Sequence, residues 1–134
     1  MAELDALREV DVGELDGRRD RAAWQVYDRT VAAWHAGELG ARFPGGESLG
    51  EAVLRLSGVL EEVVLRHRDE DVVLVGHGEI FTSVLLRLLR LGPARGLAPA
   101  SITTVRCEAE GLVCVRWGET RHLAEPPTGV PAPG

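Results

Sequence analysis

His77 stands between two glycines at a place where the chain must change direction. The run before it, Asp71-Val-Val-Leu-Val, is typical of a strand buried on both faces of a parallel α/β sheet. The apolar run after it, from about residue 79 to 91, is typical of a helix. Open α/β sheets bind ligands beyond the carboxyl ends of their strands, and the first N–H groups of a helix attract anions. A histidine in that place indicates phosphate chemistry.

The other three histidines give His77 no partner of comparable setting. His35 and His67 fall near the ends of two predicted helices, and His122 falls in a closing segment that reads as structural. The four histidines also lack the spacing of a metal-ligand set. We therefore expect neither a metal nor another cofactor.

Two amphipathic helices precede the predicted strand and would position it. The first is predicted over about residues 18–36, where bulky apolar residues recur at three- and four-residue steps: Trp24, Tyr27, Val31 and Trp34. These aromatic residues read as core residues. The second helix is predicted from Ser48 to about His67, because Ser48 and Glu51 form a capping-box pattern.

The C-terminal part reads as a hairpin followed by a tail. Residues 102–107 and 112–117 are β-rich, with a turn expected around Glu110-Gly111. A two-residue turn there would put Cys107 opposite Cys114, and a longer turn would leave them diagonal. Both are expected to be free thiols. The Pro- and Gly-rich residues 124–134 are predicted to be disordered.

Composition limits the function classes. A chain of 134 residues with a net charge of -6 is expected to form one domain and does not suit a nucleic-acid surface. All 15 basic residues are arginine, which suits bidentate phosphate contacts. The charged N-terminus does not resemble a signal peptide, and the apolar stretch at residues 80–91 is too short to span a bilayer. We expect a cytoplasmic protein.

Three patches occur in an order that resembles the histidine phosphatase superfamily, the phosphoglycerate-mutase-like enzymes. They are Leu7-Arg-Glu-Val-Asp-Val-Gly13-Glu-Leu-Asp-Gly17, Phe43-Pro-Gly-Gly-Glu-Ser-Leu49 and Val75-Gly-His-Gly78. The resemblance covers most of residues 4–123 and implies a domain over residues 1–123. It implies an α/β fold, a partial three-layer α/β/α sandwich that lacks the N-terminal strand or strands.

The family transfers phosphoryl groups through a phosphohistidine, and the resemblance implies roles for six residues. His77 matches the second histidine, which stabilises the transferring group, and Glu9 matches the acid that protonates the leaving oxygen. The residues placed near the phosphate or substrate are Gly78, Glu79, Glu47 and Ser48. The carboxylate of Glu79 would weaken anion binding there unless its side chain points away.

The sequence departs from the family where the nucleophile should be. It contains no Arg-His-Gly, and we expect that motif's strand and the segment of the second arginine to lie before Met1. Thr82 also stands where the family often has an arginine. The segment around His77 is similar to one other motif, the Gly-x-Ser-x-Gly nucleophile elbow of α/β-hydrolases. That interpretation fails because Gly78 occupies the serine position.

Two functions remain as hypotheses. The complete protein would be a phosphomonoester hydrolase or mutase acting on a small phosphorylated metabolite, and the present chain would lack its nucleophile. Alternatively, the chain would be a catalytically inactive module that binds a phosphorylated ligand or a protein partner. The loss of a central strand would leave unpaired sheet edges, so we also expect either a homodimer or a marginally stable monomer.

Overall fold

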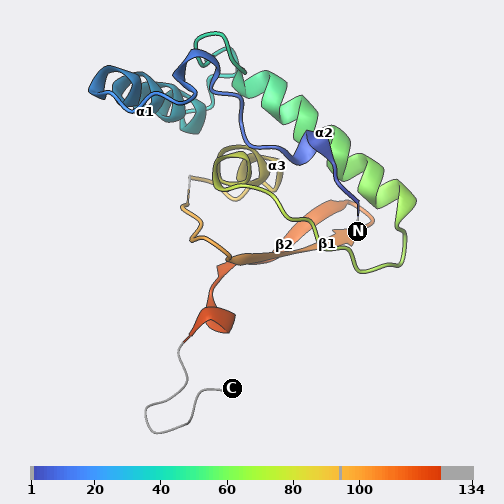
Figure 1. The fold of residues 1–134 in the computed structure, drawn as a ribbon. Helices are drawn as coiled ribbons and strands as arrows, with labels where there is room; N and C mark the ends of the chain where they lie inside the picture. The colour runs from blue at the N-terminus through green and yellow to red at the C-terminus, as the bar shows by residue number, and fades with distance from the viewer. Residues whose placement is uncertain (1, 94, 125–134) are drawn as a thin grey trace, which may run out of the picture. The chain divides into compact units, whose positions relative to one another are not determined.

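The computed structural model describes residues 2–93 and 95–124, which fall into two compact units divided between Gly96 and Leu97. Figure 1 shows the helices of the first unit and the hairpin of the second. The described chain is therefore of mixed α/β type, as predicted, with one antiparallel sheet of two strands.

The first unit contains the two predicted amphipathic helices. Helix α1 spans Arg21–His35 and is capped by Asp20, whose side chain accepts a hydrogen bond from the Ala23 amide. The Arg18 guanidinium, hydrogen-bonded to Asp20, lowers the pKa of that carboxyl to about 2. The cap therefore stays charged through most of the acid range.

Helix α2 spans Leu49–Arg66, and its predicted capping box is confirmed. The Glu51 amide donates to the Ser48 hydroxyl at 3.2 Å, and the Ser48 amide donates to the Glu51 carboxylate at 3.4 Å. The box satisfies two N–H groups that the start of a helix leaves free, so the sequence alone defines where α2 begins.

A third helix begins at Gly78 and ends at Leu88. Its middle is a π-helical segment, η3 (Ile80–Leu85), and its last turn is α3 (Leu86–Leu88). Helix α2 packs on η3 and on the short helical turn η1 (Asp5–Leu7), while α1 packs on η3. The largest fully buried side chains lie in this assembly: Trp34, Phe43, Leu49, Leu56, Ile80 and Val84.

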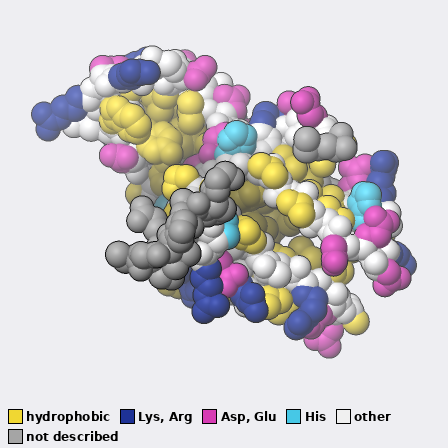
Figure 2. Space-filling view, turned by 60° about the horizontal axis from the view of Figure 1, so that its bottom comes forward, with side chains coloured by type: hydrophobic (Ala, Val, Ile, Leu, Met, Phe, Trp, Pro, Cys, Tyr) yellow, Lys and Arg dark blue, Asp and Glu magenta, His cyan; other side chains and the backbone are white. Residues whose placement is uncertain are grey.

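One predicted core residue of α1 lies at the surface. Trp34 is 1% exposed and packs edge to face on Phe43, whereas Trp24 is 55% exposed and contacts the ring of Tyr27. Trp24 lies in the first turn of α1 and Trp34 in the last. The apolar face of this helix is therefore buried at its C-terminal end but not at its N-terminal end. Figure 2 shows further hydrophobic side chains that reach the surface between charged ones.

The predicted buried strand at residues 71–76 is wrong in this structure. The segment has no regular secondary structure and pairs with no other strand in the described chain, and Val73 and Val75 are 88% and 81% exposed. A strand is stabilised by hydrogen bonds to a neighbouring strand, and the described part of this unit offers none. The helix predicted after it does form.

The second unit contains the predicted hairpin, with β1 (Ile102–Glu108) antiparallel to β2 (Gly111–Glu119). Glu108 pairs with Gly111, so the two-residue turn is Ala109-Glu110, one residue earlier than predicted. This shift pairs Cys107 with Leu112 and Cys114 with Val105. The two cysteines are therefore diagonal rather than opposite, and both are free thiols.

Two further expectations concern the C-terminal tail and membrane-spanning helices. The predicted tail falls almost wholly on residues 125–134, which lie outside the described residues. Among the helices that the structure describes, none has the length and apolar character needed to cross a membrane.

Candidate functional site

His77 is the last residue before the third helix, and its side chain is exposed. Phe81 contacts the backbone at His77 and at Gly76, the residue before it. The Phe81 amide donates to the His77 carbonyl at 3.3 Å, and the Phe81 ring lies so close to Gly76 that a Cβ there would be 2.4 Å from it. No other described side chain forms a hydrogen bond or ion pair with the His77 ring, which leaves it free to meet a ligand.

Glu9 reaches the same place from the other end of the chain. One of its carboxylate oxygens, Oε2, accepts from the Glu79 amide at 2.9 Å. The other, Oε1, accepts from the Ile80 amide at 2.8 Å and from the Val10 amide at 3.0 Å. The N–H groups that begin the helix therefore hold an anionic group, as their geometry and partial charge favour. The structure thus brings Glu9 beside Gly78 and Glu79, immediately after His77.

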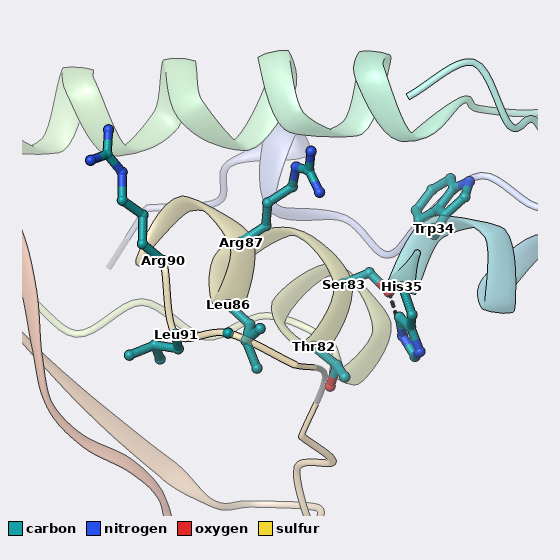
Figure 3. Close-up of a pocket in the computed structure, with 9 residues that line it drawn as sticks. Trp34, His35, Thr82, Ser83, Leu86, Arg87, Arg90 and Leu91 are labelled. Atoms are coloured by element: carbon teal, nitrogen blue, oxygen red, sulfur yellow. Dashed lines mark hydrogen bonds between the residues drawn. The ribbon is translucent and has the colours of Figure 1, made fainter. Parts of the chain in front are cut away.

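The carboxylate of Glu79 belongs to a different group of contacts. One of its oxygens lies 3.4 Å from the Tyr27 hydroxyl, and the other accepts a short hydrogen bond from the Ser83 hydroxyl. His35 completes the set, with Nε2 lying 3.1 Å from Ser83 Oγ (Figure 3). Because the Ser83 proton goes to Glu79, the His35 nitrogen is the donor to Ser83. The like-charge conflict expected near His77 is therefore relieved, since this side chain is engaged with α1.

The Tyr27 hydroxyl is held in its neutral form by these surroundings. Burial and the nearby Glu79 carboxylate raise the pKa of Tyr27 to about 12. A phenol beside a carboxylate is expected to remain a hydrogen-bond donor, because its ionisation would place two negative charges side by side. Tyr27 and His35 thus bind η3 to α1 through Glu79 and Ser83.

Glu47 and Ser48, also expected near the substrate, lie in a different set of contacts. The Glu47 carboxylate is 7% exposed and forms a bidentate ion pair with Arg55, at 2.8 and 3.0 Å. It also accepts from the Asp11 amide at 3.2 Å. Ser48 caps α2. No contact described in the structure joins either residue to His77.

Arg55 extends this cluster to the N-terminal segment. Its Nη1 donates to the Ala6 and Arg8 carbonyls at 2.8 and 2.9 Å, on the chain just before Glu9. Residues 11–13 also lie directly on the loop at residues 44–46. A Cβ at Gly46 would be 2.3 Å from the Asp11 carbonyl, and one at Gly13, whose φ is +56°, would be 2.3 Å from the Pro44 carbonyl. The glycines of the two motif patches are therefore needed for close packing, and that packing fixes the segment that carries Glu9.

Two hollows lie near these clusters, and neither is lined by His77 or Glu9. One, of about 180 Å³, lies between the end of α1 and the third helix and is lined in part by His35, Arg87 and Arg90 (Figure 3). The other, of about 250 Å³, is lined in part by Glu47, Arg55 and Arg8.

The arrangement offers two chemical functions. A free imidazole can donate to a phosphoryl oxygen or accept a proton, and a carboxyl group can donate one to a leaving oxygen. The Glu9 oxygens act as acceptors in this structure, so a phosphate at the same amides would have to displace Glu9 or bind beside it. The 134-residue sequence contains no Arg-His-Gly motif.

A comparison with protein-family profiles identifies the family of this chain. The profile of the histidine phosphatase superfamily (branch 1) matches residues 1–120. The chain belongs to the histidine phosphatase superfamily.

Two curated relatives are phosphoserine phosphatases. A metal-independent phosphoserine phosphatase from Arabidopsis thaliana is 26% identical over 123 residues, which are 91% of this chain and 52% of the relative. Phosphoserine phosphatase 1 from Hydrogenobacter thermophilus is 29% identical over 125 residues, which are 90% of this chain and 59% of the relative. The chain thus spans between a half and three-fifths of the curated relatives that it matches.

Sequence reasoning missed two groups of polar residues. The sequence partly indicated the first group, because Ser83 is one helical turn after Glu79 and His35 is two turns after Tyr27. It did not indicate that these two pairs would meet. It did not indicate the Glu47–Arg55 pair at all, because that pair joins a loop residue to the middle of α2 and only the folded chain brings them together.

Proposed function

We propose that this chain is part of a phosphomonoester hydrolase or mutase acting through a phosphohistidine, and that His77 and Glu9 are its second histidine and its acid. The 134-residue chain would bind a phosphomonoester without turning it over, because it contains no Arg-His-Gly nucleophile. The proposal includes the sandwich fold of the family, of which this chain would form a part.

The observation that carries the proposal is the position of Glu9. Glu9 and Glu79 are 70 residues apart in the sequence, yet the Glu9 carboxylate accepts from the amides of Glu79 and Ile80, directly after His77. The family resemblance pairs Glu9 with His77 on motif grounds that are independent of this geometry.

The expected ligand is a small phosphomonoester. The helix start carries partial positive charge and the His77 ring is free to donate, which together suit a dianionic phosphoryl group. The names of the two curated relatives make phosphoserine the first compound to test. Gly78 and the Glu79 amide would contact the phosphoryl group, whereas Glu47 and Ser48 would act by holding the neighbouring loop.

Binding and turnover can be measured separately on the 134-residue chain. Calorimetric titration with phosphoserine should give saturable binding, and His77→Ala should weaken it about 10- to 100-fold, the loss of one hydrogen bond to a charged group. His67→Ala is the matched control, since His67 is an exposed histidine at the end of α2. Phosphate release from phosphoserine and from p-nitrophenyl phosphate should stay at background.

The variant Glu9→Gln tests whether the Glu9 charge competes with the phosphoryl group for the start of the helix. Removing this charge should tighten phosphoserine binding about 3- to 10-fold, because a negative group no longer competes for the helix start. Weaker binding by Glu9→Gln would mean that Glu9 supports the site only by shaping it. Robust turnover that His77→Ala abolishes would contradict the missing nucleophile.

The second candidate function is a catalytically inactive module that binds a phosphorylated ligand or a protein. The exposed His77 ring and the absence of Arg-His-Gly from these residues favour it. The two candidates differ in the protein isolated from its own cells. A mass well above 14.5 kDa together with phosphatase activity supports the enzyme, and a mass at that value with binding alone supports the module.

A further inference from the structure

Glu79 brings a negative charge to the proposed phosphate site, which consists of the His77 ring and the amides of Glu79 and Ile80. The Glu79 amide donates to Glu9 at 2.9 Å, so the backbone of residue 79 lies at the site itself. A carboxylate in the first turn of a helix is attracted to the same N–H groups that would hold a phosphate. Its charge would also repel a dianionic phosphoryl group. The direction of the Glu79 side chain therefore matters for anion binding.

Two hydroxyl groups and one imidazole hold the Glu79 carboxylate. Ser83 Oγ donates a short hydrogen bond to Oε1, and the Tyr27 hydroxyl lies 3.4 Å from Oε2. His35 Nε2 lies 3.1 Å from Ser83 Oγ and 3.6 Å from Glu79 Oε1. Ser83 is 5% exposed and the Glu79 side chain 17% exposed. Both carboxylate oxygens are thus occupied in a largely buried setting.

Helix α1 supplies the fixed part of this arrangement. Tyr27 and His35 lie two helical turns apart on α1, which packs on η3, and Figure 3 shows the His35 ring meeting Ser83 there. The Tyr27 ring is itself held by Phe43, whose ring centroid is 5.7 Å away. Ser83 lies in the π-helical segment, a geometry that is frequent at functional sites. The contacts of Glu79 therefore tie the first turn of the third helix to a separate, packed helix.

We propose that Tyr27, Ser83 and His35 are positioning residues, which hold the Glu79 carboxylate away from the phosphate site. This proposal rests on the proposed function and deepens it, and it assigns the three residues no contact with the phosphoryl group. When they are removed, the Glu79 carboxylate is free to approach the N–H groups at the start of its own helix. It then competes with a phosphomonoester, so affinity falls although His77 and Glu9 are unchanged.

The first test is calorimetric titration of the Ser83→Ala variant with phosphoserine. Ser83→Ala removes the closest donor to Glu79 and should weaken binding about 3- to 10-fold. Ser57→Ala is the matched control, because it makes the same substitution within α2, and it should bind as the wild-type chain does. Unchanged circular dichroism would show that both variants fold. Equal affinity of the two variants would overturn the role of Ser83.

The two residues of α1 are tested by variants that keep the packing. Tyr27→Phe retains the ring against Phe43 and should weaken binding about 2- to 3-fold, less than Ser83→Ala because its contact is long. His35→Leu should also weaken binding, whereas His35→Gln should restore it in part, since the glutamine amide can still donate to Ser83. Wild-type affinity in both Tyr27→Phe and His35→Leu would overturn the role of α1.

A double variant distinguishes restraint of the Glu79 charge from general support of the fold. Glu79→Gln removes the charge and should bind phosphoserine at least as tightly as the wild-type chain. In the Glu79→Gln background, Ser83→Ala should change affinity less than about twofold, because there is no charge left to restrain. The same loss from Ser83→Ala in both backgrounds would show a merely structural effect and would overturn the proposal.

Amide hydrogen exchange without ligand separates this proposal from the proposed function. Ser83→Ala should speed exchange of the Glu79 and Ile80 amides at least about threefold, because residue 79 loses a contact that fixes it, and Ser57→Ala should not. A wild-type chain that binds no phosphoserine would contradict the proposed function, and with it the role of the restraint. Normal wild-type binding together with unchanged exchange in Ser83→Ala would overturn this proposal alone.

Discussion

Tyr27 is the single tyrosine of the chain and reports directly on the contacts of Glu79. Burial is the first cause of its raised pKa and the Glu79 carboxylate is the second. Because the folded pKa lies above the unfolded value of about 10, the folded chain keeps a proton that the unfolded chain loses. The contribution of Tyr27 to stability is therefore present below pH 10 and is lost as pH rises toward 12.

Titration of tyrosinate absorbance should accordingly show a midpoint near pH 12. Glu79→Gln should move the midpoint downward but not fully to 10, since burial remains. Circular dichroism recorded at each pH identifies any point at which unfolding precedes ionisation. A wild-type midpoint near 10 in chain that is still folded would show that Tyr27 and Glu79 are not in contact.

The Glu47–Arg55 pair should matter more for stability than the other ion pairs. Its side chains are 7% and 10% exposed, and Arg55 also satisfies two backbone carbonyls. Arg55→Leu leaves Glu47 buried without its partner and should lower the free energy of unfolding by about 3–5 kcal/mol. Urea denaturation measures this change.

A matched variant tests whether the stability loss comes from the burial of the pair or merely from removing one arginine charge. Arg66→Leu removes the partner of Glu62 from an exposed pair on the same helix and should change stability by less than about 1 kcal/mol. Equal losses for the two arginine variants would contradict a special role for Arg55. At the residue scale, sequence alone could suggest His77 and Glu9 by motif, but could not foresee that Glu47 would be satisfied by Arg55.

The helices could be predicted because their signals are local. The Ser48 capping box and the apolar period of α1 lie within a few residues of the elements they define. The strand predicted at residues 71–76 is absent from the described structure, since a strand depends on a partner distant in sequence and local signals do not report that partner. The hairpin was predicted, but its turn moved by one residue and changed the cysteine register.

The cap of α2 gives a test at this scale. Ser48→Ala should cost about 1 kcal/mol in unfolding free energy, because the Glu51 amide loses its acceptor. Ser57→Ala, in the interior of the same helix, should be neutral or slightly stabilising, since alanine is the better helix former. A loss at residue 57 as large as the loss at residue 48 would contradict the assigned start of α2.

At the scale of the molecule, the family match covers most of this chain but only part of its relatives. The superfamily profile matches residues 1–120, and the chain covers just over half of its curated relatives. The order and spacing of the short family motifs could be recognised from the sequence. These motifs include glycines that let two loops pack closely, as Gly13 does against Pro44. A nucleophile could not be assigned from the sequence, because these 134 residues contain no Arg-His-Gly motif.

A phosphomonoester beside His77 can be detected directly by nuclear magnetic resonance of the ¹⁵N-labelled chain during titration with phosphoserine. The His77 ring signals, assigned with His77→Gln, and the amides of Glu79 and Ile80 should shift together and saturate. The His67 ring should stay in place as an internal control. Stationary His77 signals, or shifts of His77 and His67 that run in parallel without saturation, would contradict an anion site at the start of this helix.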